Sequence, residues 1–474
     1  MTRVPASPMK GASELSKEQG KSKYHRARAG VIAVAVAALA AGGVAATQAN
    51  AAPRTPAAAS SADHGTLSIT RVKFGKTVEP YTGQNTQAYR YTLTNDRDMA
   101  VNILSYGGII QSVELPGRNG AEADVILGFK TLKDYVDEAS PPVTANGGPY
   151  FGETIGRYGN RIAKGTFSLN QPGVGKVTYT LPINNGANDL HGGLVGFGDH
   201  VWSQAGLIHS SSEVGVTLQL VSPDGDSSGA AGSPGCPTGC TGFPAKITVD
   251  VTFTLNNHDQ LGIRYKAVND SGNLNTVINL TNHSYFNLAG QGSAAGSAYS
   301  QYVQINANKY TPTDTTQIPL GYNVAVAGTP FDFRAPHAIG SRISDVSAPD
   351  HAPAADNQLL IAQGYDHNWV LNPKTHATTG PDGLNLAARA WDVASGRVLT
   401  VWTDQPGVQF YSGNFLTGTL VGITGDTYRQ GAGYTFETQH FPNSPNQSNF
   451  PSTELAAGAT MTTTTIFAFS SNGI

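Results

Sequence analysis

The sequence predicts an all-β protein built as a large sandwich or barrel. Segments rich in β-branched and aromatic residues recur along the chain, with turn residues between them, and no long stretch has helical periodicity. The 55 glycines and 27 prolines are spread throughout, as many tight turns require. A long series of short strands of this kind closes into a sandwich or a barrel.

The clearest strand covers residues 247–255, where apolar and polar residues alternate without a break. This alternation is typical of a strand with one buried and one solvated face, because successive side chains point to opposite sides of a sheet. Other strands are predicted at residues 68–74, 88–93, 101–104, 125–129, 216–221 and 263–268.

The N-terminal residues 1–51 resemble a secretory signal. Seven Lys or Arg and two Glu precede Ala29, residues 30–46 are almost all small and apolar, and Ala49-Asn50-Ala51 offers a cleavage site. A membrane anchor is the alternative, because 17 apolar residues approach the length of a span. The run is rich in Ala and Gly and poor in Leu and Phe, which favours a cleaved signal and a secreted, extracellular protein. No Arg-Arg pair precedes it, so the general export route is expected rather than the twin-arginine route.

The rest of the chain reads as one domain. Residues 52–64 are Ala, Pro, Ser and Thr with few large apolar groups, which predicts a flexible lead-in. Residues 65–474 contain no second linker of this kind and no repeat of 20–50 residues. Beyond residue 51 the formal net charge is −8, which argues against nucleic acid and anionic membranes as partners.

Residues 223–244 interrupt the strand pattern with Ser, Gly, Pro and Ala, and we interpret them as a surface insertion between two strands. Cys236 and Cys240, the two cysteines of the chain, lie inside it. A metal site would need further Cys or His ligands nearby, and this loop has none. In an exported protein the spacing therefore predicts a local disulfide.

Five polar motifs carry candidate chemistry. Each also has a structural interpretation: Arg157 could be a surface charge, His191 a turn cap, Asp366 a strand cap and Glu437 a solvent-facing strand residue. Neither a metal-ligand spacing nor a Gly-x-Ser-x-Gly elbow appears. The motifs are Gly156-Arg157-Tyr158-Gly159-Asn160-Arg161-Ile162, Leu190-His191-Gly192-Gly193, Thr281-Asn282-His283-Ser284-Tyr285-Phe286-Asn287, Tyr365-Asp366-His367-Asn368, and Gln409 together with Phe436-Glu437-Thr438-Gln439.

Taken together and in this order, the motifs resemble those of the aldose 1-epimerases, also called galactose mutarotases. The resemblance covers the chain from about residue 70 onward and includes Tyr310-Thr311-Pro312-Thr313-Asp314. It implies a large antiparallel β-sandwich of the galactose mutarotase type with an open sugar-binding cleft. Tyr158 departs from the pattern, where a smaller apolar residue is usual, as do the insertion and the signal segment.

The resemblance also implies residue roles. His283 is expected to protonate the ring oxygen, Glu437 to take the proton of the anomeric hydroxyl, and His191 to assist at the ring oxygen. The expected ligands of the sugar hydroxyls are Asn160, Arg161, Asp366 and Gln409, with Tyr285 in the same wall.

The chemistry of anomer exchange fits these residue types. A cyclic hemiacetal opens to an aldehyde and closes on the other face, so the reaction needs one base and one acid and neither a cofactor nor a metal. Two alternatives remain: a glycoside hydrolase or lyase, with Glu437 and Asp366 as paired carboxylates, and a non-catalytic sugar-binding module. A free sugar is the expected small-molecule partner.

Overall fold

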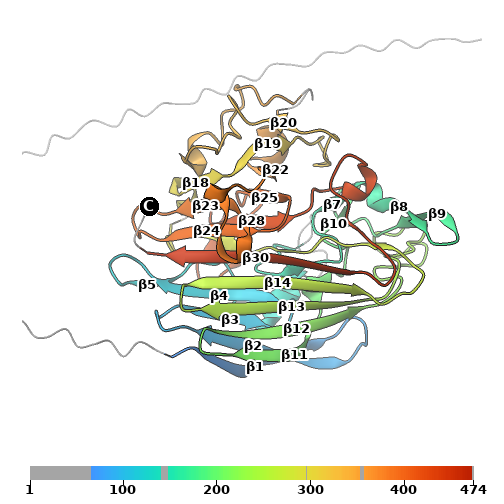
Figure 1. Cartoon of the computed structure of the whole chain (residues 1–474), viewed down its shortest axis with the longest axis horizontal. Coiled ribbons are helices and arrows are strands. Elements are labelled where there is room, and N and C mark those ends of the chain that lie inside the picture. Colours follow the sequence, from blue (N-terminus) through green and yellow to red (C-terminus); the bar gives the residue numbers. More distant parts are fainter. Residues whose placement is uncertain (1–65, 140–147, 295, 353–356, 472–474) are drawn as a thin grey trace, which may run out of the picture. The chain divides into compact units, whose positions relative to one another are not determined.

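The computed structural model describes residues 66–139, 148–294, 296–352 and 357–471 (Figure 1). Antiparallel strands dominate these residues, which confirms the all-β prediction. The signal segment 1–51 and the lead-in 52–64 lie outside the described residues. Within the described ranges, no helix has the length and apolar character that crossing a membrane requires.

A nine-stranded sheet forms the centre of the described fold. Along β13 (Ile247–Asn256) buried and half-buried residues alternate, as predicted, and the cross-strand register carries the buried face through the neighbouring strands. One face of this sheet is therefore apolar. Its strands, in spatial order, are β11 (Ser203–His209), β12 (Glu213–Ser222), β13, β14 (Gln260–Asn269), β30 (Thr460–Ser470), β24 (Val398–Thr403), β23 (Asn385–Trp391), β18 (Tyr302–Ile305) and β21 (His337–Ala338).

Two further sheets contribute to the same core. In Figure 1 the blue strands of the five-stranded sheet lie beside the green strands β12–β14, and apolar side chains of both sheets form one buried cluster. The five-stranded sheet contains β1 (Ser68–Val78), β2 (Asn85–Thr94), β3 (Ala100–Leu104), β4 (Ile109–Pro116) and β5 (Glu122–Asp124). The six-stranded sheet contains β17 (Tyr285–Phe286), β28 (Tyr434–Gln439), β25 (Gly407–Tyr411), β22 (Asp366–Leu371), β19 (Ala307–Thr311) and β20 (Val324–Ala325).

Short strand pairs and short helices complete the described fold. The pairs are β7 (Arg161–Ile162) with β10 (Asp189–Leu190), β6 (Thr154–Ile155) with β16 (Thr281–Asn282), β15 (Thr276–Val277) with β29 (Glu454–Leu455), β8 (Thr166–Gln171) with β9 (Gly175–Thr180), and β26 (Thr417–Val421) with β27 (Thr427–Arg429). The helices are α1 (Leu132–Ala139), α2 (Gln358–Ala362) and the 3-10 turns η1 (Ala163–Gly165), η2 (Phe197–Asp199), η3 (Ser297–Ser300), η4 (Ile339–Ser341), η5 (His376–Thr378), η6 (Pro381–Gly383) and η7 (Ser444–Asn446).

The strand predicted at residues 125–129 was wrong. This segment is extended and buried, but its hydrogen bonds go to different partners in turn: the amide of Val125 donates to Val113, and that of Leu127 donates to Tyr285. A segment that crosses between two sheets has no single partner strand, so its β-like composition reflects burial rather than membership of a sheet.

Residues 223–244 connect β12 to β13, as expected, but they are not a free surface loop. Phe243 and Cys236 are almost fully buried, and Ser227 Oγ donates to the carbonyl of Gly192 over 2.9 Å. Exposed residues alternate with these anchors. The Gly, Ser and Pro composition predicted the irregular backbone and not the burial, because small residues also permit close packing.

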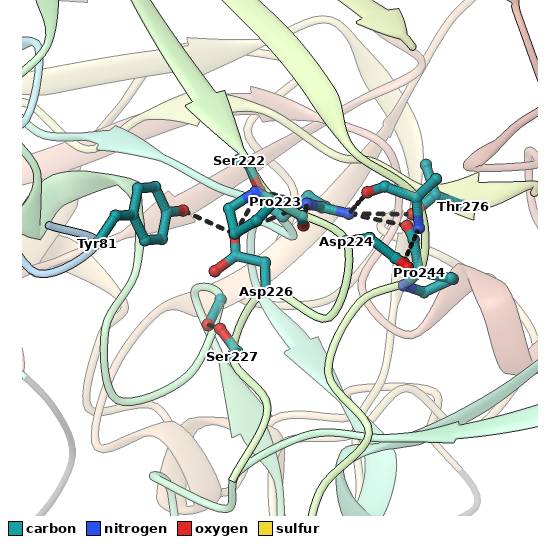
Figure 2. Close-up of polar contacts among 11 residues, drawn as sticks. Tyr81, Ser222, Pro223, Asp224, Asp226, Ser227, Pro244 and Thr276 are labelled. Atoms are coloured by element: carbon teal, nitrogen blue, oxygen red, sulfur yellow. Dashed lines mark hydrogen bonds and ion pairs between the residues drawn. The ribbon is translucent and has the colours of Figure 1, made fainter. Parts of the chain in front are cut away.

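Arg157 holds both ends of this insertion, so the interpretation of Arg157 as a surface charge was wrong. Its guanidinium is buried; it donates to Ser222 Oγ and the Pro223 carbonyl at the entry, and to the Pro244 carbonyl at 2.9 Å at the exit. Asp226 lies 3.8 Å away as its counter-charge and accepts a hydrogen bond from the Tyr81 hydroxyl. Figure 2 shows the labelled partners Tyr81, Ser222, Pro223, Asp226 and Pro244.

A disulfide joins Cys236 and Cys240 within the insertion, four residues apart in sequence. The same loop is also closed by two backbone hydrogen bonds between Gly229 and Cys240. We expect Cys236→Ser with Cys240→Ser to fold and to keep its activity, with a loss of about 2 kcal/mol or less, because so small a ring restrains the unfolded chain little. Thermal unfolding and activity assays check this, and thiol titration of the unreduced native protein should find no free thiol. Loss of folding in the double variant would contradict it.

Candidate active site

A cavity of about 640 Å³ brings the predicted site residues together. Seven of the eight predicted catalytic and sugar-binding residues line it: His283, Glu437, His191, Asn160, Arg161, Tyr285 and Asp366. The eighth, Gln409, lies behind Asp366 and donates its amide N–H to the Asp366 carboxylate over 2.7 Å. A cavity of this size, with hydrogen-bonding side chains set among apolar ones, suits a small hydroxyl-rich molecule.

The six-stranded sheet positions the carboxylates. In its register Glu437 on β28 is opposite Gln409 on β25, and Tyr411 on β25 is opposite Asp366 on β22. Paired residues point to the same face of a sheet, so these side chains share one face. Their immediate neighbours, such as Phe410 and Phe436, point to the other face and join the core. One face of this sheet therefore packs into the core, and the other carries the polar residues of the cavity. Glu437 points into the cavity rather than to solvent.

His283 and Glu437 face each other across the cavity wall. His283 lies between β16 and β17, and its Nε2 is 3.5 Å from Glu437 Oε1. That oxygen accepts a hydrogen bond from the Thr435 hydroxyl at 2.9 Å. The second oxygen, Oε2, has no hydrogen-bond partner among the described residues. A buried carboxylate oxygen without a partner is strongly disfavoured unless a ligand supplies the donor.

Burial shifts both groups toward their neutral forms. It raises the pKa of Glu437 from 4.5 to about 8, with a contribution from the nearby Asp366 charge. It lowers the pKa of His283 from 6.5 to about 3. Perturbed titration in a polar cavity is typical of groups that transfer protons.

His191 is fixed in one tautomer by the segment that carries Asn160. The backbone N–H of Asn160 donates to His191 Nδ1 at 3.1 Å, and the backbone N–H of His191 donates to the Asn160 carbonyl at 3.2 Å. Burial, His283 and Arg161 all lower the pKa of His191 well below its ordinary value. A neutral imidazole that accepts at Nδ1 carries its proton at Nε2, so His191 is a hydrogen-bond donor at Nε2.

This tautomer bears on a possible metal site. The ligand atoms of His191, His283 and Glu437 lie within 4.8 Å of one another, a set that could hold a metal ion. A metal at His191 Nε2 would need a lone pair where the proton sits, and binding at Nδ1 would break the hydrogen bond from Asn160. The cluster therefore fits a ligand that accepts hydrogen bonds from His191 better than it fits a cation.

Arg161 and Asp366 form a second, charged part of the wall. Arg161 Nε donates to Asn185 Oδ1 at 3.0 Å, and Nη2 donates to Gln317 Oε1. The Gln317 amide in turn donates to Asp366 Oδ2 at 2.9 Å. Burial lowers the pKa of the Arg161 guanidinium, while the Asp366 charge raises it.

Among the lining residues that sequence reasoning missed are Tyr150, Tyr411 and Gln317. The Tyr150 ring meets that of His191 edge-on, with centroids 4.7 Å apart, and Tyr411 packs on Tyr285 with centroids 5.8 Å apart. The aromatic pair Tyr150-Phe151 before Gly152 was a usable signal for the first. Gln317 gave none, because the quoted motif ends at Asp314 and a lone glutamine in a turn is unremarkable in sequence.

The raised pKa of Glu437 predicts a pH-dependent cost in stability. Between pH 4.5 and about 8 the residue ionises in the unfolded chain and stays protonated in the folded one, so the folded state is destabilised as pH rises through this window. Glu437→Gln removes this loss. We expect the variant to gain roughly 1–3 kcal/mol over the native protein at pH 8 and nothing at pH 4.5. Sugar-free thermal melts at both values check it; an equal difference at both pH values would contradict it.

Fold and site together define an acid–base enzyme on an antiparallel β-sandwich, with a cavity for a polar small molecule. The sequence model of aldose 1-epimerase matches residues 89–468. The chain belongs to the aldose 1-epimerase family, and it is an isomerase.

Individual relatives agree with this family. Galactose mutarotase of Sus scrofa is 39% identical over 404 residues, covering 85% of this chain and 99% of the relative. Aldose 1-epimerase of Escherichia coli K12 is 32% identical over 366 residues, covering 77% and 90%. Among solved structures, galactose 1-epimerase from Lactobacillus acidophilus aligns with a TM-score of 0.65 and 28% identity, over 85% of this chain and 99% of that one.

Proposed function

We propose that this enzyme interconverts the α and β anomers of free aldoses such as glucose and galactose, with His283 and Glu437 as the acid–base pair. The observation that carries the proposal is the 3.5 Å approach of these groups in a cavity lined by hydroxyl-binding side chains. Glu437 takes the proton of the anomeric hydroxyl while His283 gives a proton to the ring oxygen, and the C1–O5 bond breaks. After rotation about C1–C2, the reverse transfers close the ring on the other face.

The proton balance of this step explains why the pair is buried. Glu437 as carboxylate with His283 as imidazolium becomes Glu437 as acid with His283 neutral when the ring opens. Burial favours the neutral state, whereas the attraction of opposite charges 3.5 Å apart favours the ionised state. Because the two effects oppose each other, neither proton distribution is favoured by both, which suits a reaction that runs in both directions.

The remaining polar residues bind and orient the sugar. His191 donates from Nε2 toward the ring oxygen, assisting His283. Asn160, Arg161 and Asp366 bind hydroxyls, Tyr285 forms part of the wall, and Gln409 holds the Asp366 carboxylate in place. These hydrogen bonds fix C1 relative to the acid and the base, which lowers the entropy lost on reaching the transition state.

Asp366→Asn is expected to raise KM about 10–100-fold with a smaller effect on kcat. The carboxylate accepts amide donors from both Gln409 and Gln317, and the Asn amide would direct an N–H at one of them. The loss of charge-assisted hydrogen bonds of about 1.5–3 kcal/mol gives this magnitude. Steady-state polarimetry measures both constants, with Asp98→Asn on an exposed turn as the matched control. Unchanged kinetic constants would remove Asp366 from the binding site.

A glycoside hydrolase would use Glu437 and Asp366 as its two carboxyl groups. Such an enzyme needs one of them protonated as the acid or free as a nucleophile. Each oxygen of Asp366 already accepts a side-chain amide hydrogen, an arrangement that stabilises a fixed carboxylate and suits a binding role. The paired His283 also has no part in that mechanism, so anomer exchange is the better account.

Polarimetry of freshly dissolved α-D-glucose and α-D-galactose tests the proposal. With purified protein the optical rotation should reach equilibrium far faster than without it. A hydrolase would instead release reducing ends from a glycoside, and a binding module would do neither. An unchanged rate for both sugars and for other free aldoses would overturn the assignment.

We further propose that the protein is exported and works outside the cell. The basic tail, the apolar run at residues 30–46 and Ala49-Asn50-Ala51 support a cleaved signal. The disulfide between Cys236 and Cys240 is in keeping with an oxidising compartment. N-terminal sequencing of protein recovered from the culture medium should begin at Ala52; recovery only from the cell interior with residues 1–51 intact would contradict export.

A further inference from the structure

The side chain of Gln317 joins the two charged residues of the sugar-binding wall. Its Oε1 accepts from Arg161 Nη2, and its Nε2 donates to Asp366 Oδ2 at 2.9 Å. Gln317 itself lines the cavity. An amide suits this place because it offers an acceptor to the cation and a donor to the anion at the same time.

The turn that carries Gln317 is rigidly built. Asp314 Oδ1 accepts from the backbone N–H groups of Thr316 at 2.8 Å and Ile318 at 3.1 Å, and the Gln317 N–H donates to the Asp314 carbonyl. Asn188, close to His191 in sequence, donates its side-chain amide to the Thr316 carbonyl at 3.2 Å. Gln317 has a φ of 62°, a left-handed conformation that a non-glycine residue adopts only when its surroundings impose it. The side chain is therefore directed into the cavity by the turn itself.

The amide also keeps opposite charges apart. Among the described residues, Arg161 and Asp366 make no direct ion pair, although the Asp366 charge raises the pKa of Arg161. A guanidinium and a carboxylate in a desolvated wall attract strongly, and without a spacer they would close on each other. Such a pair would take up the donor and acceptor positions that sugar hydroxyls need.

We propose that Gln317 is a specificity-determining residue that acts through Asp366 and Arg161. It holds the two charged groups at the separation that matches a pattern of sugar hydroxyls, so that a change at one hydroxyl changes the fit. The proposal rests on the proposed anomer exchange, and it adds a residue that determines which aldose is preferred.

The test compares Gln317→Leu with the native protein on α-D-glucose and α-D-galactose, two sugars that differ in one hydroxyl configuration. We expect KM to rise about tenfold for the better sugar, kcat to stay within about twofold, and the ratio of kcat/KM between the two sugars to change at least about threefold. A general loss of structure would lower kcat/KM for both sugars by the same factor. Gln304→Leu on β18 is the matched control, because the Gln304 side chain donates to the Arg334 carbonyl and lies outside the cavity wall.

A double variant separates the specific role from a structural one. In the Asp366→Asn background, Gln317→Leu should change KM less than about twofold, because its main partner has already lost the charge. The inference would be overturned if Gln317→Leu raised KM by the same factor in the native and the Asp366→Asn backgrounds. It would also be overturned if the single variant left the ratio of kcat/KM between the two sugars unchanged. An inactive native protein would instead overturn the proposed function, so the two failures are distinguishable.

Discussion

Replacing Glu437 with Gln is expected to lower kcat for mutarotation by about 10²–10⁴-fold. The amide keeps the size of the side chain and can still accept the hydrogen bond from Thr435, but it cannot take the anomeric proton. His283→Ala should cost about a hundredfold or more by removing the acid on the other side. Polarimetric initial rates at saturating sugar measure both.

Binding supplies the control for these variants. Glu437→Gln leaves Arg161, Asp366 and His191 in place, so sugar affinity measured by calorimetry should change much less than kcat. Melting temperature shows whether each variant is folded. A folded Glu437→Gln or His283→Ala protein with a normal rate would remove that residue from the acid–base pair.

Arg157→Met should destabilise the fold by about 3–5 kcal/mol, the largest loss of stability that we expect from a single substitution here. The buried guanidinium satisfies the Pro223 and Pro244 carbonyls and faces Asp226. Methionine fills part of the volume but removes the guanidinium donors to these carbonyls and leaves the buried Asp226 carboxylate without its counter-charge. Urea unfolding measures the change in free energy.

Arg264→Met is the matched control for Arg157→Met, because Arg264 is exposed on β14 and its loss should change stability by less than about 0.5 kcal/mol. A comparable small effect at Arg157 would mean that solvent or a rearranged chain replaces its hydrogen bonds. The variant also reports on the insertion, since both ends of residues 223–244 depend on the same side chain.

Sequence pattern was most informative where side chains alternate. The sequence of β13 predicted both its extended conformation and its buried face, because side chains of a half-buried strand alternate with a period of two. A segment that is buried on all sides shows no such alternation. Residues 125–129 are apolar because they are buried, and their composition was therefore mistaken for that of a strand. Arg157 was misleading for a related reason: a charge is buried only where the fold supplies enough acceptors, and these come from residues far away in sequence.

The candidate site was predictable to the extent that its residues lie in motifs. His283, Glu437 and their neighbours could be named, whereas the tautomer of His191 depends on a backbone N–H some thirty residues away. Gln317 shows the limit most clearly. The role of Gln317 depends on its position between Arg161 and Asp366, and the packed turn at residues 314–318 sets that position.

The position of β30 has a consequence for how the chain is made. This strand, Thr460–Ser470, lies in the middle of the nine-stranded sheet, between β14 and β24. Until these residues have left the ribosome, no hydrogen-bonded strand joins β14 to β24, and the two parts of the sheet stay separate. We therefore expect a product that stops before Thr460 to be degraded by proteases rather than to form a smaller folded protein, because its central sheet is incomplete.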